Sequence, residues 1–127
     1  MQRTVVETDR APAAIGPYSQ GVRWGHLVFT AGQLGIDPST GNFIGEGIRE
    51  QTRQALENVK AVLQAADSSL ANVVKVTVFL ADMAEFGLMN EVYASYFDRD
   101  PPARSAVQVA ALPKGGRVEI EAVAIAD

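Results

Sequence analysis

The spacing of apolar positions changes several times along the chain, and two stretches have the spacing of helices. From Ile48 onward, apolar residues recur at three- and four-residue steps, which predicts an amphipathic helix lying on a core. Its inward positions are Ile48, Thr52, Ala55, Leu56, Val59, Val62, Leu63 and Ala66. A second helix is predicted after Asp82, because Asp82 and Glu85 have the spacing of a capping box, and Pro101 and Pro102 end it. Its apolar stripe is Phe86, Met89, Val92, Tyr93, Tyr96 and Phe97.

Other stretches have the pattern of strands. Residues 25–32 form an apolar run between glycines, and residues 72–81 are rich in β-branched side chains. In the second run, alternation predicts one face with Val74, Val76, Val78 and Leu80 and an opposite face with Val73, Thr77 and Phe79. Residues 37–41 have turn chemistry inside a hairpin. Residues 103–110 and 117–126 are predicted to pair as a hairpin through the turn at 113–116.

The order of these elements predicts an α+β domain over residues 1–127 with a further layer outside the chain. Two helices can cover only one face of such a sheet. The other face keeps Val73, Phe79, Val123 and Ile125, and the chain has no further element to cover them. Another subunit is therefore expected to do so.

Composition narrows the possible functions. The net charge is −4, which gives no electrostatic support for binding nucleic acid. Cysteine is absent and histidine occurs once, so neither a Cys-based site nor a multi-His metal site is expected. No apolar run approaches membrane-spanning length, and a cytoplasmic protein without a metal is expected.

Two ionic residues stand in apolar strands. Arg104 could offer its bidentate guanidinium to the carboxylate of a ligand. Alternatively, it could pair with a structural acid or simply be solvated at the strand end, and the pattern alone favours neither interpretation. Glu119 and Glu121 share one strand face that continues into Val123 and Ile125. A carboxylate beside apolar surface can hold or activate a water, although two acids on a solvated sheet edge are the commoner case.

Two further residues are weaker candidates. Tyr18 is presented by the glycine-punctuated loop 15–21, where a lone aromatic residue more often caps the core. Asn90 lies at the edge of the second helix's apolar stripe, where such a residue is usually only solvated.

Several motifs in order along the chain resemble the RidA group of reactive intermediate deaminases, formerly called the YjgF family. They are Gly-Pro-Tyr-Ser-Gln at 16–20, Thr-Ala-Gly-Gln at 30–33, Pro-Ala-Arg-Ser at 102–105 and Glu-Ile-Glu-Ala at 119–122. Together they are highly specific, and the resemblance extends over nearly the whole chain.

The resemblance implies a chorismate-mutase-like fold of the bacillary type, with a mixed sheet and two helices on one face, assembled as a homotrimer with ligand sites between subunits. It implies a cofactor-independent hydrolysis of 2-aminoacrylate and related imines to 2-keto acids and ammonia. By motif, Arg104 would hold the substrate carboxylate and Glu119 would position water. Tyr18, Thr30, Gly32 and Asn90 would line the pocket together with Ala106, which stands where many relatives have cysteine. A non-catalytic sensor that binds 2-keto acids is the alternative.

The predicted hairpin carries a geometric consequence for this site. It would place Arg104 opposite residues 123–124, roughly 13–17 Å along the strand from Glu119 at about 3.3 Å per residue. A three-carbon substrate cannot bridge that gap, so a site using both side chains is expected to be shared between two chains.

Overall fold

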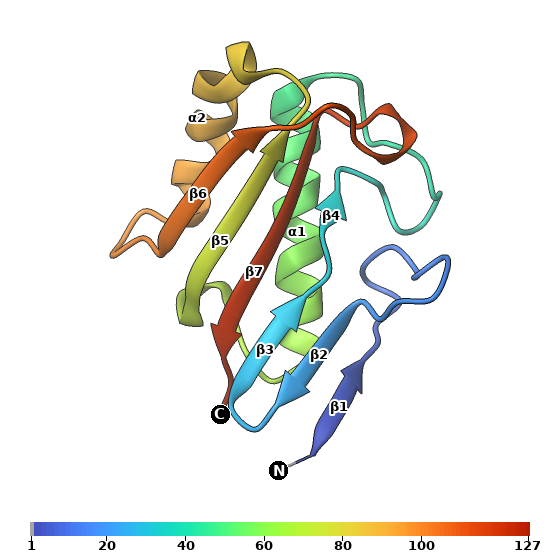
Figure 1. Ribbon diagram of the computed structural model, residues 1–127, viewed down its shortest axis with the longest axis vertical. Coiled ribbons are helices and arrows are strands. Elements are labelled where there is room, and N and C mark those ends of the chain that lie inside the picture. Colours follow the sequence, from blue (N-terminus) through green and yellow to red (C-terminus); the bar gives the residue numbers. More distant parts are fainter. Residues whose placement is uncertain (1) are drawn as a thin grey trace.

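The computed structural model describes residues 2–127 and contains one mixed sheet with both α-helices packed on the same face (Figure 1). The strand order is β1-β2-β3-β7-β5-β6, and the short β4 also pairs with β7. The elements are β1 (Arg3–Val6), β2 (Gly21–Trp24), β3 (Leu27–Thr30), β4 (Gln33–Leu34), α1 (Ile48–Ala65), η1 (Leu70–Asn72), β5 (Val73–Leu80), η2 (Met83–Glu85), α2 (Phe86–Tyr96), β6 (Ala103–Gln108), η3 (Pro113–Gly115) and β7 (Val118–Ile125). The predicted α+β class is confirmed. Within the described residues, no helix is both long and apolar enough to cross a membrane.

Helix α1 is the element that the sequence predicted most completely. All eight predicted inward positions are buried, because they lie on the face that packs against β3, β4 and β7. A buried polar residue on this face, Asn58, donates its amide to the carbonyl oxygens of Leu34 and Ile36 at 3.0 and 2.9 Å. The helix thereby fixes the chain that leaves β4.

The start of the second helical segment differs from the prediction in one respect. Asp82 acts as a cap, since its carboxylate accepts a hydrogen bond from the backbone N–H of Ala84. Glu85 does not complete a capping box; its carboxylate pairs with Arg117 at 3.0 Å instead. The single turn of η2 precedes α2, which begins at Phe86.

The predicted faces of β5 are wrong at the beginning of the strand. The register with β7 shifts between Val73 and Lys75, so Val73 turns into the core while Val74 is exposed. Such a bulge reverses the alternation for the residues that precede it. From Val76 onward the predicted faces are confirmed.

The predicted hairpin of the last two strands is also wrong. Strand β6 pairs with β5 in parallel, and β7 pairs with β5 and β3 in antiparallel fashion, so β5 lies between the two. Residues 109–117 cross the end of β5, where the N–H of Val109 donates to Leu80 and that of Ala81 to Arg117. The two strands therefore have partners that lie far away in sequence.

The sheet face opposite the helices is apolar and open in the single chain. The predicted open positions Phe79, Val123 and Ile125 do lie there. The register adds further large side chains that are at least 40% exposed, namely Val5, Trp24, Leu27, Phe29 and Val107. These eight residues are called the open face below.

Candidate active site

Arg104 lies on β6 with its side chain directed toward α2. It is level with Val76, a core residue on the helix-covered face, so its side chain leaves the sheet on that side. One guanidinium N–H donates to Oδ1 of Asn90 at 2.7 Å. The guanidinium carbon lies 4.6 Å from the ring centre of Tyr93 and 5.4 Å from that of Phe86. Ala106 lies on the same face two residues further, partly buried against the core.

The guanidinium of Arg104 has no acidic partner among residues 2–127. The ion pairs in this part of the chain join Arg23 to Asp67, Arg49 to Glu91 and Arg117 to Glu85. Its bond to Asn90 involves a neutral amide and leaves most of the N–H groups free. The pairing with a structural acid that the sequence left open is therefore absent within residues 2–127. Arg104 is also partly buried, unlike a side chain simply solvated at a strand end, and its positive charge is available to an anion.

Glu119 lies on β7 and points to the opposite face of the sheet. It is level with Leu34 of β4 and with Phe79 of the open face. Burial raises the pKa of its carboxyl group, and the nearby negative charge of Glu121 raises it further. A carboxylate with a raised pKa accepts a proton from a bound water more readily than a fully solvated carboxylate does.

The carboxylate of Glu119 rests on Gly32. A Cβ atom added to Gly32 would lie 2.7 Å from Cδ of Glu119 and 3.0 Å from Oε2. Only glycine leaves room for the carboxylate in this position. Gly32 thus contributes to the site because it has no Cβ atom, which leaves room for the carboxylate of Glu119.

Glu119, Gly32 and Tyr18 line one pocket of about 710 Å³. Its other walls are mostly apolar and come from the loop before β2, from β4 with the segments on either side of it, and from η3: Pro12, Ala13, Ile15, Ala31, Gln33, Leu34, Ile36, Pro38, Gly41, Pro113 and Lys114. Lys114 and Glu119 are the two charged residues among the described residues that line it. A small polar ligand in this pocket would be surrounded by one acidic residue, one basic residue and mostly apolar walls.

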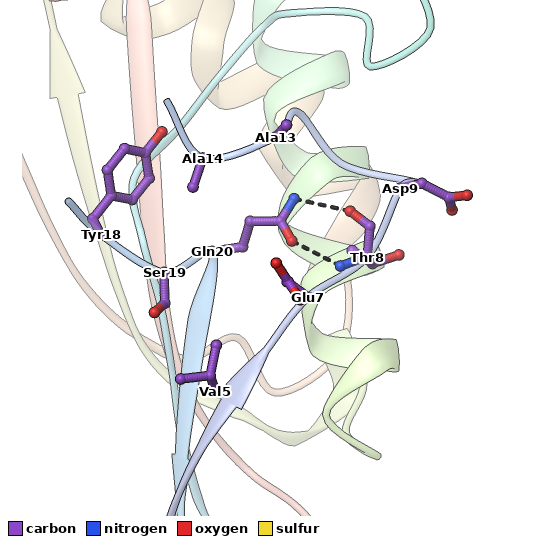
Figure 2. Close-up of a pocket in the computed structure, with 9 residues that line it drawn as sticks. All are labelled: Val5, Glu7, Thr8, Asp9, Ala13, Ala14, Tyr18, Ser19 and Gln20. Carbon is purple, nitrogen blue, oxygen red and sulfur yellow. Dashed lines mark hydrogen bonds between the residues drawn. The ribbon is translucent and has the colours of Figure 1, made fainter. Parts of the chain in front are cut away.

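A buried glutamine fixes the loop that carries Tyr18. Figure 2 shows Gln20 reaching across a second pocket, of about 530 Å³, to Thr8. Its Oε1 accepts from the N–H of Thr8 at 2.7 Å, and its Nε2 donates to the carbonyl groups of Thr8, Ala11 and Pro12. One side chain therefore replaces regular backbone pairing for this segment, and Tyr18 stands between the two pockets.

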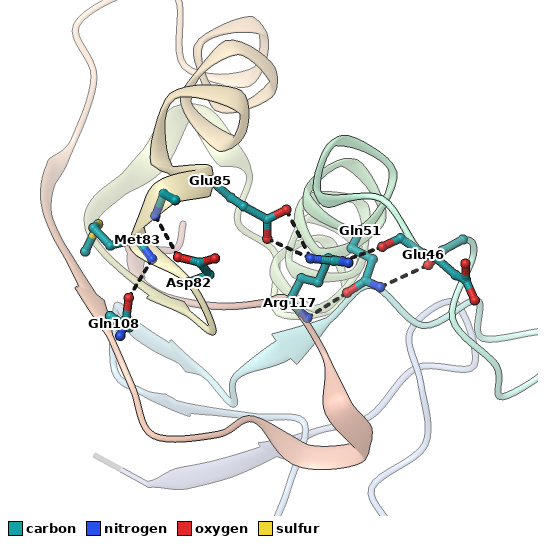
Figure 3. A network of polar contacts seen from close by, with 9 residues as sticks. Glu46, Gln51, Asp82, Met83, Glu85, Gln108 and Arg117 are labelled. Atoms are coloured by element: carbon teal, nitrogen blue, oxygen red, sulfur yellow. Dashed lines mark hydrogen bonds and ion pairs between the residues drawn. The ribbon is translucent and has the colours of Figure 1, made fainter.

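The wall containing Lys114 is held by an arginine network, shown in Figure 3. Arg117 donates from its side chain to the carbonyl of Glu46 and the carboxylate of Glu85, and its N–H donates to Gln51. Gln51 in turn donates to the carbonyl of Gly45 at 2.9 Å. The network ties the turn after η3 to the loop that precedes α1.

Thr30 does not line this pocket. Its side chain is buried on the helix side, where Oγ1 accepts from the N–H of Ala122 at 3.0 Å. The bond uses a backbone N–H of β7 and lies where β3 ends, just before β4 begins. Thr30 and Gly32 are two residues apart, a spacing that places side chains on the same face of a regular strand. The strand is interrupted between them, because β3 ends at Thr30 and β4 begins only at Gln33, so the two residues do not share a wall.

The two groups of candidate residues do not meet within one chain. Arg104 is level with Val76 and hence with Ala122, three residues from Glu119 and two strands away. These steps amount to roughly 10 Å along the strands and about 10 Å across them. The side chains also leave opposite faces of the sheet. The separation expected from the sequence was based on a hairpin of the last two strands, which is wrong. The observed strand pairing also keeps Arg104 and Glu119 apart within one chain.

Sequence reasoning missed several residues around these groups. Phe86 and Tyr93 were assigned to the apolar stripe of the second helix, although they also contact Arg104. Their spacing from Asn90, four and three residues, places all three on one side of a helix and was the available signal. Nothing in the pattern distinguished Gln20 or Lys114.

Comparison with known proteins gives consistent matches along the chain. The model of the endoribonuclease L-PSP family matches residues 8–126. The 2-iminobutanoate/2-iminopropanoate deaminase of Mus musculus is 53% identical over 123 residues, covering 97% of this chain and 91% of the mouse protein. The human protein of the same name is 52% identical over 123 residues, with coverage of 97% and 90%.

Solved structures of other proteins have closely similar folds. The E. coli TdcF structure with bound serine has a TM-score of 0.94 and 47% identity, with coverage of 98% of this chain and 99% of TdcF. RidA from the Antarctic bacterium Psychrobacter has a TM-score of 0.93 and 49% identity, with coverage of 96% and 98%.

Proposed function

The chain belongs to the endoribonuclease L-PSP family, and from this premise we propose that it is a 2-iminobutanoate/2-iminopropanoate deaminase. The enzyme hydrolyses these imines to 2-keto acids and ammonia. Its relatives of about 50% identity that carry this name extend over nearly the whole chain.

The observation that carries the proposal is the guanidinium of Arg104, which is partly buried and has no carboxylate partner in residues 2–127. Withdrawing a cation from water without a counter-ion is costly. A substrate carboxylate would supply that counter-ion, and the planar guanidinium fits it with two parallel hydrogen bonds. Both 2-iminopropanoate and 2-iminobutanoate have this carboxylate next to the reacting carbon.

The chemistry requires only orientation and proton transfer. Arg104 would hold the carboxylate, and Glu119 would accept a proton from water as the oxygen bonds to the imine carbon. That proton then passes to nitrogen, which gives a carbinolamine. The remaining hydroxyl proton follows to the nitrogen as the keto C=O bond forms, the C–N bond breaks and ammonia leaves, so that the keto oxygen comes from water. Tyr18 and Gly32 would shape the pocket around this water, and no step requires a cofactor or a metal.

Arg104 and Glu119 would meet between subunits of a homotrimer with a chorismate-mutase-like arrangement. Two features support this assembly: the two side chains leave opposite faces of one sheet, and the open face exposes large apolar side chains. In such a trimer Arg104, Asn90 and Ala106 of one chain would face Tyr18, Gly32 and Glu119 of the next. Thr30 would support this wall from behind through its bond to β7. We place the enzyme in the cytoplasm, with the pyridoxal-phosphate enzymes that release such imines.

The family description mentions ribonucleases, but the residues of this chain favour the deaminase. The net charge is −4, and within the described residues no three His, Cys, Asp or Glu side chains cluster as metal ligands. A sensor that only binds 2-keto acids is less well supported, because relatives of about 50% identity are named as enzymes.

Turnover of freshly generated 2-aminoacrylate tests the function directly. A dehydratase produces it from serine, and keto-acid formation is followed with and without this protein, beside the binding of pyruvate alone. The deaminase should accelerate keto-acid formation catalytically at substoichiometric concentration. Pyruvate binding without acceleration would instead identify a sensor.

Complementation tests the shared site. Arg104→Ala and Glu119→Ala proteins should each be inactive, and mixing them under conditions of subunit exchange should restore part of the activity through hybrid sites. Mass spectrometry should confirm that mixed trimers form. If such trimers form and remain inactive, the two residues do not act across an interface.

A further inference from the structure

We propose that Tyr93 is the residue that positions Arg104 for the substrate carboxylate, and that it acts through the face of its ring. The inference rests on the proposed function, since it assigns a role to α2 in the same site.

The geometry places the guanidinium of Arg104 among three side chains of α2. The ring centres of Tyr93 and Phe86 lie 4.6 and 5.4 Å from the guanidinium carbon, both within the range of cation–π attraction. Asn90, on the same side of the helix, accepts one N–H at 2.7 Å. One edge of the guanidinium is thereby fixed, and the other N–H groups remain available for a carboxylate.

Tyr93 itself is held more firmly than the other contacts. It is 6% exposed, whereas Phe86 and Asn90 are only partly buried. Its ring also packs against Phe97, with 4.7 Å between ring centres and 37° between planes. A flexible arginine gains a defined position only from a neighbour that is itself immobile, and Tyr93 meets this condition best.

The hydroxyl group of Tyr93 takes no part in this arrangement. It is buried and has no hydrogen-bond partner within the described chain. Burial raises the pKa of this hydroxyl, so the side chain stays neutral and meets the guanidinium through the face of its ring. The ring, and not the hydroxyl, is therefore the part of Tyr93 that matters to Arg104.

Three substitutions separate positioning from general packing. Tyr93→Phe retains the ring and loses the hydroxyl; Tyr93→Leu loses the ring. Tyr96→Leu is the matched control, because it removes another tyrosine ring of α2 that packs against the core and has no recorded contact to Arg104 among the described residues. Phe86→Leu, which removes the more distant ring, provides a second test if Tyr93→Leu does not fold.

For Tyr93→Leu we expect KM for the imine, and Kd for 2-oxobutanoate, to rise by roughly five- to thirtyfold, the span for a partly desolvated cation–π contact. The value of kcat should change less than KM, because the carboxylate is held in both ground and transition states. Tyr93→Phe and Tyr96→Leu should stay within about twofold of wild type in KM. Circular dichroism and size-exclusion chromatography should show that each variant is folded and assembled.

A double variant tests whether the effect passes through the guanidinium. In an Arg104→Lys background, Tyr93→Leu should change Kd by much less than it does in the wild type, because the planar group that stacks on the ring is gone. An equal effect in both backgrounds, or a Tyr93→Leu variant that binds like wild type, would overturn the positioning role.

The outcomes also separate this inference from the proposed function. If the wild type binds 2-oxobutanoate without hydrolysing imines, the deaminase function fails while the Kd series still decides the role of Tyr93. If the wild type hydrolyses imines and Tyr93→Phe loses as much affinity as Tyr93→Leu, the function stands and the inference is wrong. A wild type that neither binds nor hydrolyses overturns both.

Discussion

Adding one methyl group at Gly32 should inactivate the enzyme by moving Glu119. The Cβ atom of Gly32→Ala would lie 2.7 Å from Cδ and 2.9 Å from Cγ of Glu119. Carbon atoms in contact are separated by about 3.5–4.0 Å. The carboxylate must therefore retreat by about 1 Å, away from the position in which it would hold the water.

The size of the loss follows from this displacement. A misplacement of about 1 Å can reduce a rate by about 100-fold, which corresponds to about 2.7 kcal/mol in the activation free energy. The free energy of unfolding should change much less. The φ angle of Gly32 lies outside the left-handed region, so alanine fits the backbone there. Alanine also restricts the unfolded chain more than glycine does, which stabilises the folded state by about 0.4–1 kcal/mol and offsets part of the destabilisation caused by crowding.

The assay compares kcat/KM for 2-iminopropanoate with Kd for 2-oxobutanoate. We expect Gly32→Ala to lose about 100-fold in kcat/KM while Kd, which depends mainly on Arg104, changes only a few-fold. Gly87→Ala is the matched control, because its added methyl meets no described atom within 4 Å. This control should keep full activity.

A second background identifies the cause of the loss. When Glu119 is already replaced by alanine, the Gly32→Ala substitution has no carboxylate to displace and should cost little further activity at high enzyme concentration. If Gly32→Ala loses the same factor in both backgrounds, or if it is fully active alone, the carboxylate does not act from the position seen here.

Two further predictions concern the charged residues. Arg104→Ala should abolish imine hydrolysis without changing the trimer seen by size-exclusion chromatography, and Arg104→Lys should recover little activity because an ammonium lacks the bidentate fork; full activity of the alanine variant would exclude Arg104 from the site. Glu119→Gln should bind 2-oxobutanoate normally and turn over slowly, and equal losses of binding and turnover would contradict its role with water. Because burial and Glu121 raise the folded-state pKa of Glu119, its contribution to stability is present below the unfolded pKa and is lost as pH rises through the folded one. Glu119→Gln should therefore melt at a higher temperature than wild type near pH 7, with the difference shrinking toward about pH 4, and activity of the wild type should fall as acid protonates Glu119.

Local patterns predicted helices better than they predicted strand partners. The eight inward positions of α1 follow from one periodicity, and the structure buries all of them. The pairing of β6 could not be predicted in this way, because an alternating strand has the same pattern whether it joins the next strand as a hairpin or an earlier one in parallel. The bulge at Val73 is likewise a property of the ladder, and the strand's own residues do not indicate it.

In the candidate site, too, local sequence pattern indicated some features and not those that depend on how distant segments pack. Arg104 was identifiable because an isolated cation stood in an apolar strand within a specific motif. Its aromatic contacts on α2 were hidden, because Phe86 and Tyr93 also satisfied the pattern of a core-facing stripe. For Thr30, the motif gives the position along the chain, but the direction of the side chain depends on where β3 ends, and in the single chain its hydroxyl faces Ala122.

The central place of β7 has a consequence for biosynthesis. This last strand of the sequence lies between β3 and β5, which do not pair with each other (Figure 1). While the ribosome is still synthesising the chain, β1 to β3 and β5 to β6 can form only as separate pieces, each with an unpaired edge. The sheet closes after residues 118–125 have left the exit tunnel, and these residues bring Glu119 with them. A nascent chain released early would therefore expose two strand edges to aggregation and lack the acid of the site, so that folding and the capacity for catalysis arrive in a single late step.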